Sequence, residues 1–218
     1  MTRGYYEMPS DHIYIRPESW DKPFEAPEHV CSSYDNCHVP WGSTHEKTWH
    51  LVKTLPHVSG LFVWTGFDYL GEPTPYWWPS RSSFFGIVDL AGFPKDVYYM
   101  YKSEWTDEPV LHIFPHWNWK EGEPVDIWAY YNNADEVELY LNGKSLGVRQ
   151  KTDSTYHVSW RVPFTPGTLR AVSRLGGKEV LVKEIHTAGE PARLVLTPDR
   201  SVIQADGSDL SFVTVDVC

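Results

Sequence analysis

Cysteine is scarce in this chain, and no long apolar run is present. Its three cysteines, Cys31, Cys37 and Cys218, are too few for a disulfide framework or a four-thiolate metal site. A Cys31–Cys37 disulfide that closes a short loop is one alternative, and free thiols are favoured over it. The 218 residues are enough for one large domain or two small ones.

Positive charge is also not in excess. The formal net charge is -10 at pH 7, and such a chain repels a phosphate backbone or an anionic lipid surface. No apolar run approaches the roughly 20 residues needed to cross a bilayer, and residues 1–20 lack the basic start and apolar centre of a signal peptide. We therefore expect no nucleic-acid partner and no membrane partner, while export is neither indicated nor excluded.

The sequence also lacks motifs that bind a metal or a cofactor. The stretch HEKTWH resembles a zinc-protease motif, but His45 and His50 are five positions apart, which puts them roughly 140° apart around a helix. The other histidines have no ligand spacing, and the sequence contains no Gly-rich phosphate loop and no GxSxG nucleophile elbow. We expect neither a metal nor a cofactor.

Aromatic residues, in contrast, are abundant at 15% of the chain, and nine of the 11 tryptophans lie at or before Trp119. Trp64 is followed by Asp68 and Glu72, and then by Trp77 and Trp78. A flat indole beside carboxylates suits a sugar, because the ring packs on the C–H face of a pyranose while acidic groups accept its hydroxyls. Packing of Trp64 in a core, with Trp77 and Trp78 at a domain junction, explains the same pattern equally well.

The first half of the chain has the pattern of an α/β fold. A long loop over 1–42 precedes a helix that Ser43 is expected to cap, with Glu46 completing a capping box, and the helix ends near Pro56. The apolar run GLFVWTGFDYLG predicts a strand buried on both faces. A long loop and a second helix, opened by Pro94, follow. Long loops after strands and short turns before them are typical of a (β/α)8 barrel.

From Val110 onward the chain alternates short strands with turn signals. Seven strands are expected before residue 190, with Asn142-Gly143 and Gly176-Gly177 as two-residue hairpin turns. That number of strands predicts an immunoglobulin-like sandwich. Residues 190–218 offer two or three more strands, which are too few for a second sandwich.

Several long motifs resemble glycoside hydrolase family 2, the β-galactosidase and β-glucuronidase group. GLFVWTGFDYLGEPTPY resembles the eighth barrel strand and its loop, and FFGIVDLAGFPKDVYYMYKSEW resembles the segment that leads into the last barrel helix. YDNCHVPWGSTHEKTW is similar to the approach to the seventh helix, and NADEVELYLNGKSLG to a hairpin of the sandwich that follows the barrel. The resemblance implies the C-terminal part of a TIM barrel over 1–107, an immunoglobulin-like sandwich over 108–189 and the start of a further, truncated β domain over 190–218.

The resemblance also implies where the chemistry lies. Family members hydrolyse with retention through two glutamates, an acid/base and a nucleophile, whose carboxyls are about 5 Å apart. Both glutamates are expected upstream of Met1, so the isolated chain would be inactive. An Asp68 and Glu72 pair within this chain remains as a minor alternative, because four positions in one strand-to-loop segment do not oppose two carboxyls across a bond.

The resemblance assigns the sugar-binding wall to this chain. Trp64 matches the tryptophan of the eighth strand that forms the floor of the sugar subsite. The other candidate substrate contacts are Asn36, His38, Asp68, Trp77 and Trp78. For Asp68, hydrogen bonding that holds the loop is the slightly favoured alternative.

Other conspicuous residues are interpreted as structural. Asp89 and Glu104 are expected to hold the fold. For Trp117, Trp119 and Trp128, packing in the core or at the junction with the barrel is favoured over a separate carbohydrate site.

The expected partners are a carbohydrate substrate and the remainder of the protein's own barrel and N-terminal domains. The expected function is part of a retaining exo-acting β-glycosidase, with β-galactosidase favoured. The alternative is a non-catalytic carbohydrate-binding or adhesion module. A periplasmic or secreted bacterial enzyme is compatible with the resemblance.

Overall fold

The computed structural model describes residues 33–36, 42–72 and 81–218. The chain divides into two compact units, Met1–His186 and Thr187–Cys218. The described part is mostly β-structure with few helices, and none of its helices has the length and apolar character of a membrane span. Cys31 and Cys37 lie outside the described residues, and Cys218 is an exposed free thiol.

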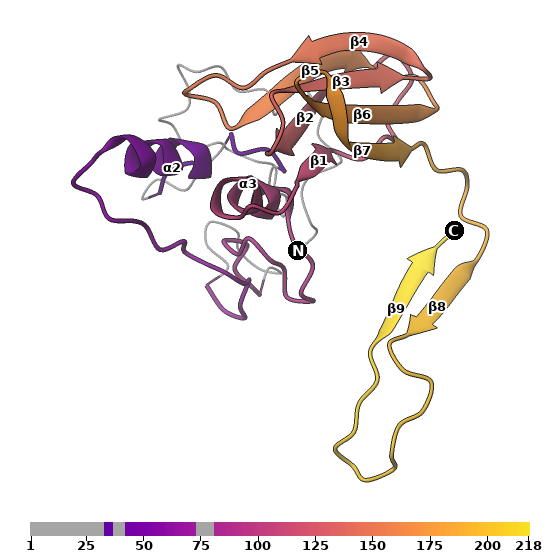
Figure 1. The fold of residues 1–218 in the computed structure, drawn as a ribbon. Coiled ribbons are helices and arrows are strands. Elements are labelled where there is room, and N and C mark those ends of the chain that lie inside the picture. The colour runs from indigo at the N-terminus through magenta and orange to yellow at the C-terminus, as the bar shows by residue number, and fades with distance from the viewer. Residues whose placement is uncertain (1–32, 37–41, 73–80) are drawn as a thin grey trace. The chain divides into compact units, whose positions relative to one another are not determined.

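Seven strands of the first unit form two sheets (Figure 1). The three-stranded sheet has the order β1-β2-β5 and the four-stranded sheet the order β4-β3-β6-β7, with all neighbours antiparallel. Each of the seven strands that the alternating pattern predicts is present. Their bounds are β1 Leu111–Phe114, β2 Pro124–Tyr131, β3 Glu136–Leu141, β4 Lys144–Arg149, β5 His157–Pro163, β6 Thr168–Leu175 and β7 Lys178–His186.

Two glycine-containing turns fix the register of the four-stranded sheet. Asn142 and Gly143 join β3 to β4 with φ of 50° and 80°, and Gly176 and Gly177 join β6 to β7 with φ of 56° and 78°. Both central residues of a type I′ turn need positive φ, which Asn and Gly adopt most readily. The two predicted hairpins are confirmed.

The sandwich core lies between the two sheets. Inward positions of β2, β3, β5 and β6 supply residues such as Ile127, Leu139, Trp160 and Leu169, each at most 4% exposed. Trp117 is fully buried in the same cluster, and its indole Nε1 donates to the Thr165 carbonyl at 3.0 Å. Burial of these apolar surfaces is the main force that holds the two sheets together.

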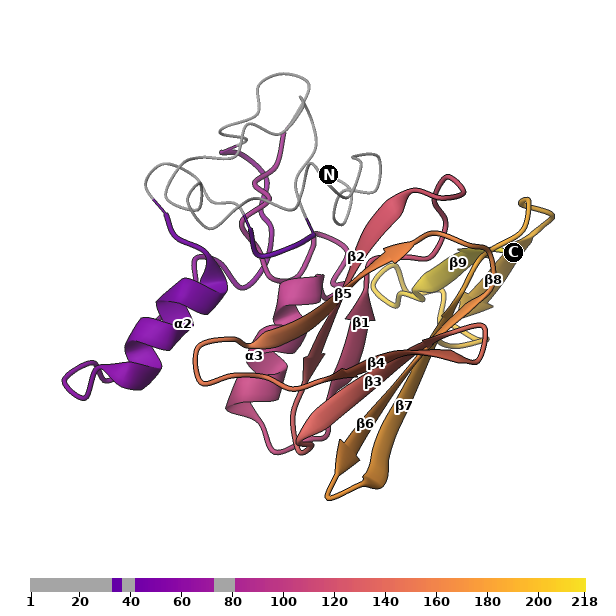
Figure 2. The same cartoon turned by 90° about the horizontal axis from the view of Figure 1, so that it is seen from above.

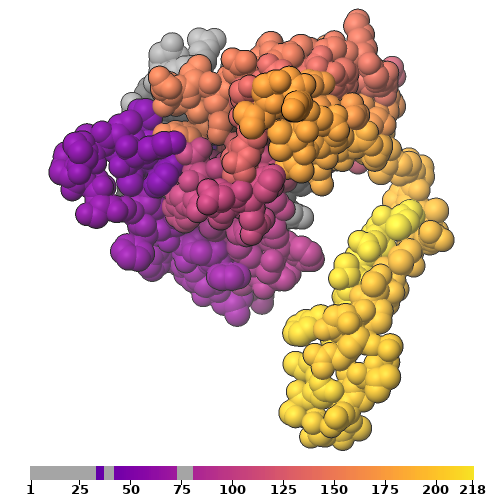
Figure 3. All heavy atoms as spheres, in the orientation of Figure 1, coloured from indigo at the N-terminus to yellow at the C-terminus, as the bar shows by residue number. Residues whose placement is uncertain are grey.

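The outer face of the three-stranded sheet is covered by a helix, which is why β2 is buried on both faces. Helix α3, Asp96–Trp105, contacts β2 and β1 (Figure 2). Met100 and Tyr101 of α3 pack with Trp128 and Tyr130 of β2 in a second apolar cluster. Residues 42–72 and 81–110 belong to the same compact unit as the sandwich, and Figure 3 shows them against its strands.

Helix α2, His45–Thr54, is present where the sequence predicts it, but its start differs. Thr44, not Ser43, is the N-cap, and no side chain of the N-cap bonds to the helix. Asp35 caps it instead, because its carboxylate accepts the backbone N–H of His45 at 2.8 Å and of Glu46 at 2.7 Å. The predicted capping box is therefore wrong. A residue ten positions upstream takes its place, and the carboxylate of Glu46 is left for a partner in the sandwich.

The buried strand expected over 60–71 is not formed within the described part of the chain. The segment is extended but makes only isolated bridges, for example between Phe67 and Val88. Large apolar side chains are exposed along it, with Phe62 completely exposed, Phe67 63% and Leu70 79% exposed. In the described part of the chain the segment pairs only with residues 81–88, and a strand buried on both faces needs a sheet neighbour on each side and layers above and below.

The second unit is a β-hairpin. Strand β8, Leu194–Pro198, pairs antiparallel with β9, Val213–Val217. Its apolar side chains, such as Leu196 and Val215, are largely exposed. The placement of a partial barrel over 1–107, the immunoglobulin-like class of the sandwich and the identity of 190–218 as a further domain remain predictions.

Candidate functional site

Trp64 lies on the exposed segment and forms a small cluster with Tyr69 and Glu72, named here the Trp64 cluster. The indole is 72% exposed. Its Nε1 donates to the hydroxyl of Tyr69 at 3.3 Å, and the two rings meet edge to face with centroids 6.2 Å apart. The Tyr69 hydroxyl in turn donates a hydrogen bond to the Glu72 carboxylate. An open indole face therefore stands beside a phenol and a carboxylate.

The backbone under the Trp64 cluster is fixed by the segment that runs beside it. Tyr69 N donates to Ser83 Oγ at 3.2 Å, and Ser83 N donates to the Tyr69 carbonyl at 2.8 Å. Ser83 is fully buried. Gly71 N donates to the Arg81 carbonyl at 2.8 Å, and the peptide between Trp64 and Thr65 is cis.

Asp68, one of the predicted sugar contacts, points into the protein and is 8% exposed. Its two carboxylate oxygens lie 2.9 and 2.8 Å from Nζ of Lys95, and Oδ1 also accepts the backbone N–H of Gly86 at 2.8 Å. Lys95 Nζ donates further to the Phe84 carbonyl at 3.0 Å. These bonds join residue 68 to the loop that precedes α3, so the described contacts of Asp68 are those of a loop-holding residue.

The remaining predicted contacts are placed only in part. Asn36 is 4% exposed, next to the Asp35 that caps α2. His38, Trp77 and Trp78 lie outside the described residues. Of the six predicted substrate contacts, the structure thus presents Trp64 at the surface and buries Asp68 and Asn36.

A buried polar cluster joins α2 to the sandwich, and the sequence patterns did not reveal it. Glu46 Oε1 accepts from His157 Nδ1 of β5 at 2.6 Å, and the His157 ring stacks on Trp128 with centroids 3.5 Å apart. Burial raises the pKa of Asp35 in spite of the nearby His45, and burial together with the charge of Asp35 raises the pKa of the Tyr101 hydroxyl. These partners are up to 111 positions apart in sequence, so no local pattern marks them.

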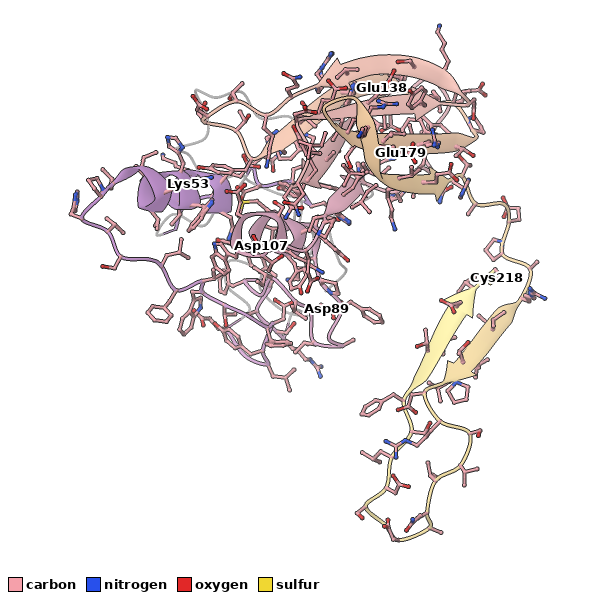
Figure 4. The ribbon with its side chains drawn as sticks, in the orientation of Figure 1. Lys53, Asp89, Asp107, Glu138, Glu179 and Cys218 are labelled. Carbon is pink, nitrogen blue, oxygen red and sulfur yellow. The ribbon has the colours of Figure 1, made fainter. Side chains whose placement is uncertain are left out.

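The residues interpreted as structural make hydrogen bonds and packing contacts within the fold. Glu104 of α3 accepts from Trp49 and Lys53 of α2, and Figure 4 labels Lys53 on that helix. Asp89 Oδ1 accepts two backbone N–H groups of its own loop, at 2.8 and 2.9 Å. Trp117 packs in the sandwich core, Trp119 packs partly buried against that core, and Trp128 packs with residues of α3. No group of His, Cys, Asp or Glu side chains suited to a metal is found among the described residues.

Comparison with known proteins places this arrangement in a family. Over 217 residues, all of this chain, it is 64% identical to "Beta-galactosidase BoGH2A" of Bacteroides ovatus. A solved structure of a glycosyl hydrolase family 2 member from Bacteroides cellulosilyticus DSM 14838 superposes with a TM-score of 0.66 at 34% identity, over 79% of this chain. The chain belongs to glycoside hydrolase family 2.

Two further comparisons give a second relative and a domain match. A "Putative beta-glucuronidase" of Formosa agariphila is 38% identical over 88% of this chain. The profile of a domain of unknown function, DUF4982, matches residues 122–181, which covers β2 to the start of β7. The chain spans about a quarter of the length of the first relative (26%), 19% of the second, and 25% of the solved structure.

Proposed function

We propose that this chain is part of a retaining family 2 glycosidase that removes terminal β-linked sugars from oligo- or polysaccharides, with β-galactosidase activity favoured. The observation that carries the proposal is the 64% identity, over the whole chain, to a protein named as a β-galactosidase. The relative named as a putative β-glucuronidase is 38% identical, and this difference favours galactose over glucuronic acid.

The chain's contribution to this activity is a sugar-binding wall at Trp64. An indole that is 72% exposed offers a flat apolar face to the C–H groups of a pyranose. The edge of the ring packs against Tyr69, whose hydroxyl accepts from the indole N–H, so the open face is the part that meets the sugar.

The exposed segment around Trp64 is proposed to be a barrel strand. It lies between α2 and α3 in the chain, in the order of a barrel unit, and it displays Phe62, Phe67 and Leu70 to solvent. An apolar face of this kind suits burial against other strands of the same barrel. In this proposal residues 1–107 complete a barrel, and the sandwich and the 190–218 hairpin belong to accessory β domains.

The two catalytic glutamates are proposed to lie in the rest of the protein, and the isolated chain is expected to be inactive. Retention requires two carboxyls about 5 Å apart across the scissile bond. The buried carboxylates at positions 46, 68 and 104 are each paired with a basic side chain. Glu72 accepts from the Tyr69 hydroxyl and is not proposed as a catalytic group.

The test uses the full-length enzyme and Trp64→Ala, with kcat/KM measured on an aryl β-galactoside and an aryl β-glucuronide. Loss of one stacked indole should lower kcat/KM by about 30-fold to 100-fold. Trp119→Phe in the sandwich is the control and should change kcat/KM less than about twofold. Unchanged kinetics in Trp64→Ala would remove Trp64 from the site, and a preference for the glucuronide would overturn the substrate assignment.

The non-catalytic alternative predicts the opposite result. If the sandwich were a carbohydrate-binding module, Trp119→Phe would weaken retention on a polysaccharide column while the full-length protein showed no turnover on either glycoside.

A further inference from the structure

The Trp64 cluster forms a directed chain of hydrogen bonds. An indole N–H is a donor only, so the oxygen of Tyr69 must act as the acceptor for Trp64. The proton of Tyr69 is then committed to the Glu72 carboxylate. The Tyr69 hydroxyl is protonated at neutral pH because the ordinary pKa of tyrosine is about 10, and the hydrogen bond to Glu72 raises that pKa further. The order of donors runs from Trp64 through Tyr69 to Glu72 and has no alternative direction.

The backbone is shaped to bring Glu72 back to Tyr69. Gly71 has φ of 91° and Glu72 has φ of 45°, so two successive residues are in the left-handed region. Non-glycine residues rarely adopt this region, and such positions cluster at functional sites. The turn folds the chain so that a carboxylate three positions after Tyr69 reaches the tyrosine hydroxyl.

We propose that Tyr69 and Glu72 are positioning residues that hold the indole of Trp64 in the orientation required for sugar stacking. This inference rests on the proposed function, in which Trp64 contacts the sugar. An indole that is 72% exposed can rotate about its side-chain bonds. The phenol edge packed against it and the hydrogen bond to Nε1 select one orientation before the sugar arrives. Preorganisation of this kind lowers the entropy lost on binding.

The roles of Tyr69 and Glu72 are different. Tyr69 touches Trp64 directly, through both its ring and its oxygen. Glu72 acts through Tyr69, because it fixes where the tyrosine proton points and leaves the oxygen lone pairs to the indole. An uncharged acceptor at position 72 should therefore serve nearly as well as a carboxylate.

The experiment is a double-mutant cycle in the full-length enzyme on an aryl β-galactoside. Tyr69→Phe and Glu72→Ala should each lower kcat/KM by about 5-fold to 20-fold, in the same kinetic parameter that Trp64→Ala changes. Glu72→Gln should stay within about threefold of the wild type, because its amide oxygen still accepts from Tyr69. In the Trp64→Ala background, Tyr69→Phe should have almost no further effect.

The matched control is Tyr140→Phe. Tyr140 also donates its hydroxyl to a glutamate, Glu138, but on strand β3 of the four-stranded sheet, where Figure 4 labels Glu138. Removal of that bond should leave kcat/KM unchanged.

Two results overturn the inference. One is a fully additive effect of Tyr69→Phe and Trp64→Ala, and the other is wild-type kinetics of Tyr69→Phe and Glu72→Ala while Trp64→Ala is impaired. If Trp64→Ala itself has wild-type kinetics, the proposed function fails first, so the two failures are distinguishable. If Tyr69→Phe does not fold, the comparison of Glu72→Ala with Glu72→Gln decides, since equal losses in both contradict positioning.

Discussion

Glu104 ties the two helices of the first unit to each other and to the sandwich, and its replacement gives a sharp test of how that junction is held. Its side chain is 8% exposed. Oε2 accepts from Trp49 Nε1 at 3.0 Å and from Lys53 Nζ at 2.9 Å, both on α2. Oε1 lies 3.4 Å from Nζ of Lys151, in the segment between β4 and β5.

The size of the destabilisation expected from replacing Glu104 follows from these three contacts. Lys53 is 55% exposed, so solvent screens its pair with Glu104 and reduces its contribution to less than about 1 kcal/mol. The indole bond to a charged acceptor contributes about 1.5 kcal/mol. Lys151 is only 21% exposed and would keep a poorly compensated charge. Glu104→Gln keeps one acceptor for Trp49 and should destabilise the attachment of α2 by about 2 kcal/mol.

The pH dependence of this effect has a defined sign. Burial alone would raise the pKa of Glu104, but the hydrogen bonds from Trp49 and Lys53 and the charges of both lysines lower it below the ordinary 4.5. A carboxyl with a lowered pKa stabilises the folded state above its unfolded pKa and loses that contribution as the pH falls through the folded pKa. The wild type and Glu104→Gln should therefore differ at pH 7 and converge as the pH falls through the folded pKa of Glu104, which lies below 4.5.

The assay is amide hydrogen exchange of residues 48–55 in the full-length protein. A change of about 2 kcal/mol in local opening accelerates exchange about 30-fold at pH 7. Glu108→Gln is the matched control, because Glu108 also pairs with a lysine, Lys102 at 2.6 Å, but is 71% exposed. Equal exchange of α2 in the wild type and in Glu104→Gln at pH 7 would refute the reasoning.

Three further substitutions test the support under Trp64. A Cβ at Gly86 would lie 2.1 Å from Asp68 N and 2.4 Å from the Phe67 carbonyl carbon. Gly86→Ala should therefore separate residues 81–88 from residues 65–71 and lower the full-length enzyme's kcat/KM at least about 10-fold. Wild-type kinetics of this variant would show that the close approach is not needed. Asp68→Asn breaks the buried pair with Lys95 and should lower the melting temperature of the full-length enzyme by several degrees, while Lys95→Met should do the same. A large rise in KM for Asp68→Asn, without loss of thermal stability, would indicate sugar contact instead.

Local sequence patterns predicted the sandwich well because its determinants are local. Alternation along β3 and β5 and the Asn142-Gly143 turn each act within a few residues, and they agree with the observed register. The start of α2 differs from the local prediction because its cap comes from Asp35, ten positions away from His45. The capping box pattern carried no information about that competitor.

In the candidate site, too, some features follow from the sequence and others from the tertiary structure. The sequence by itself determined the family resemblance, the order of helices and strands, and the tryptophan that marks the proposed sugar wall. Tertiary structure decided which nearby side chains serve it: Asp68 turns inward to Lys95, whereas Tyr69 and Glu72 remain at the indole. The direction of a side chain in an extended segment depends on the segment packed beside it. Here the neighbouring segment is residues 81–88, which form hydrogen bonds with the backbone of residues 65–71.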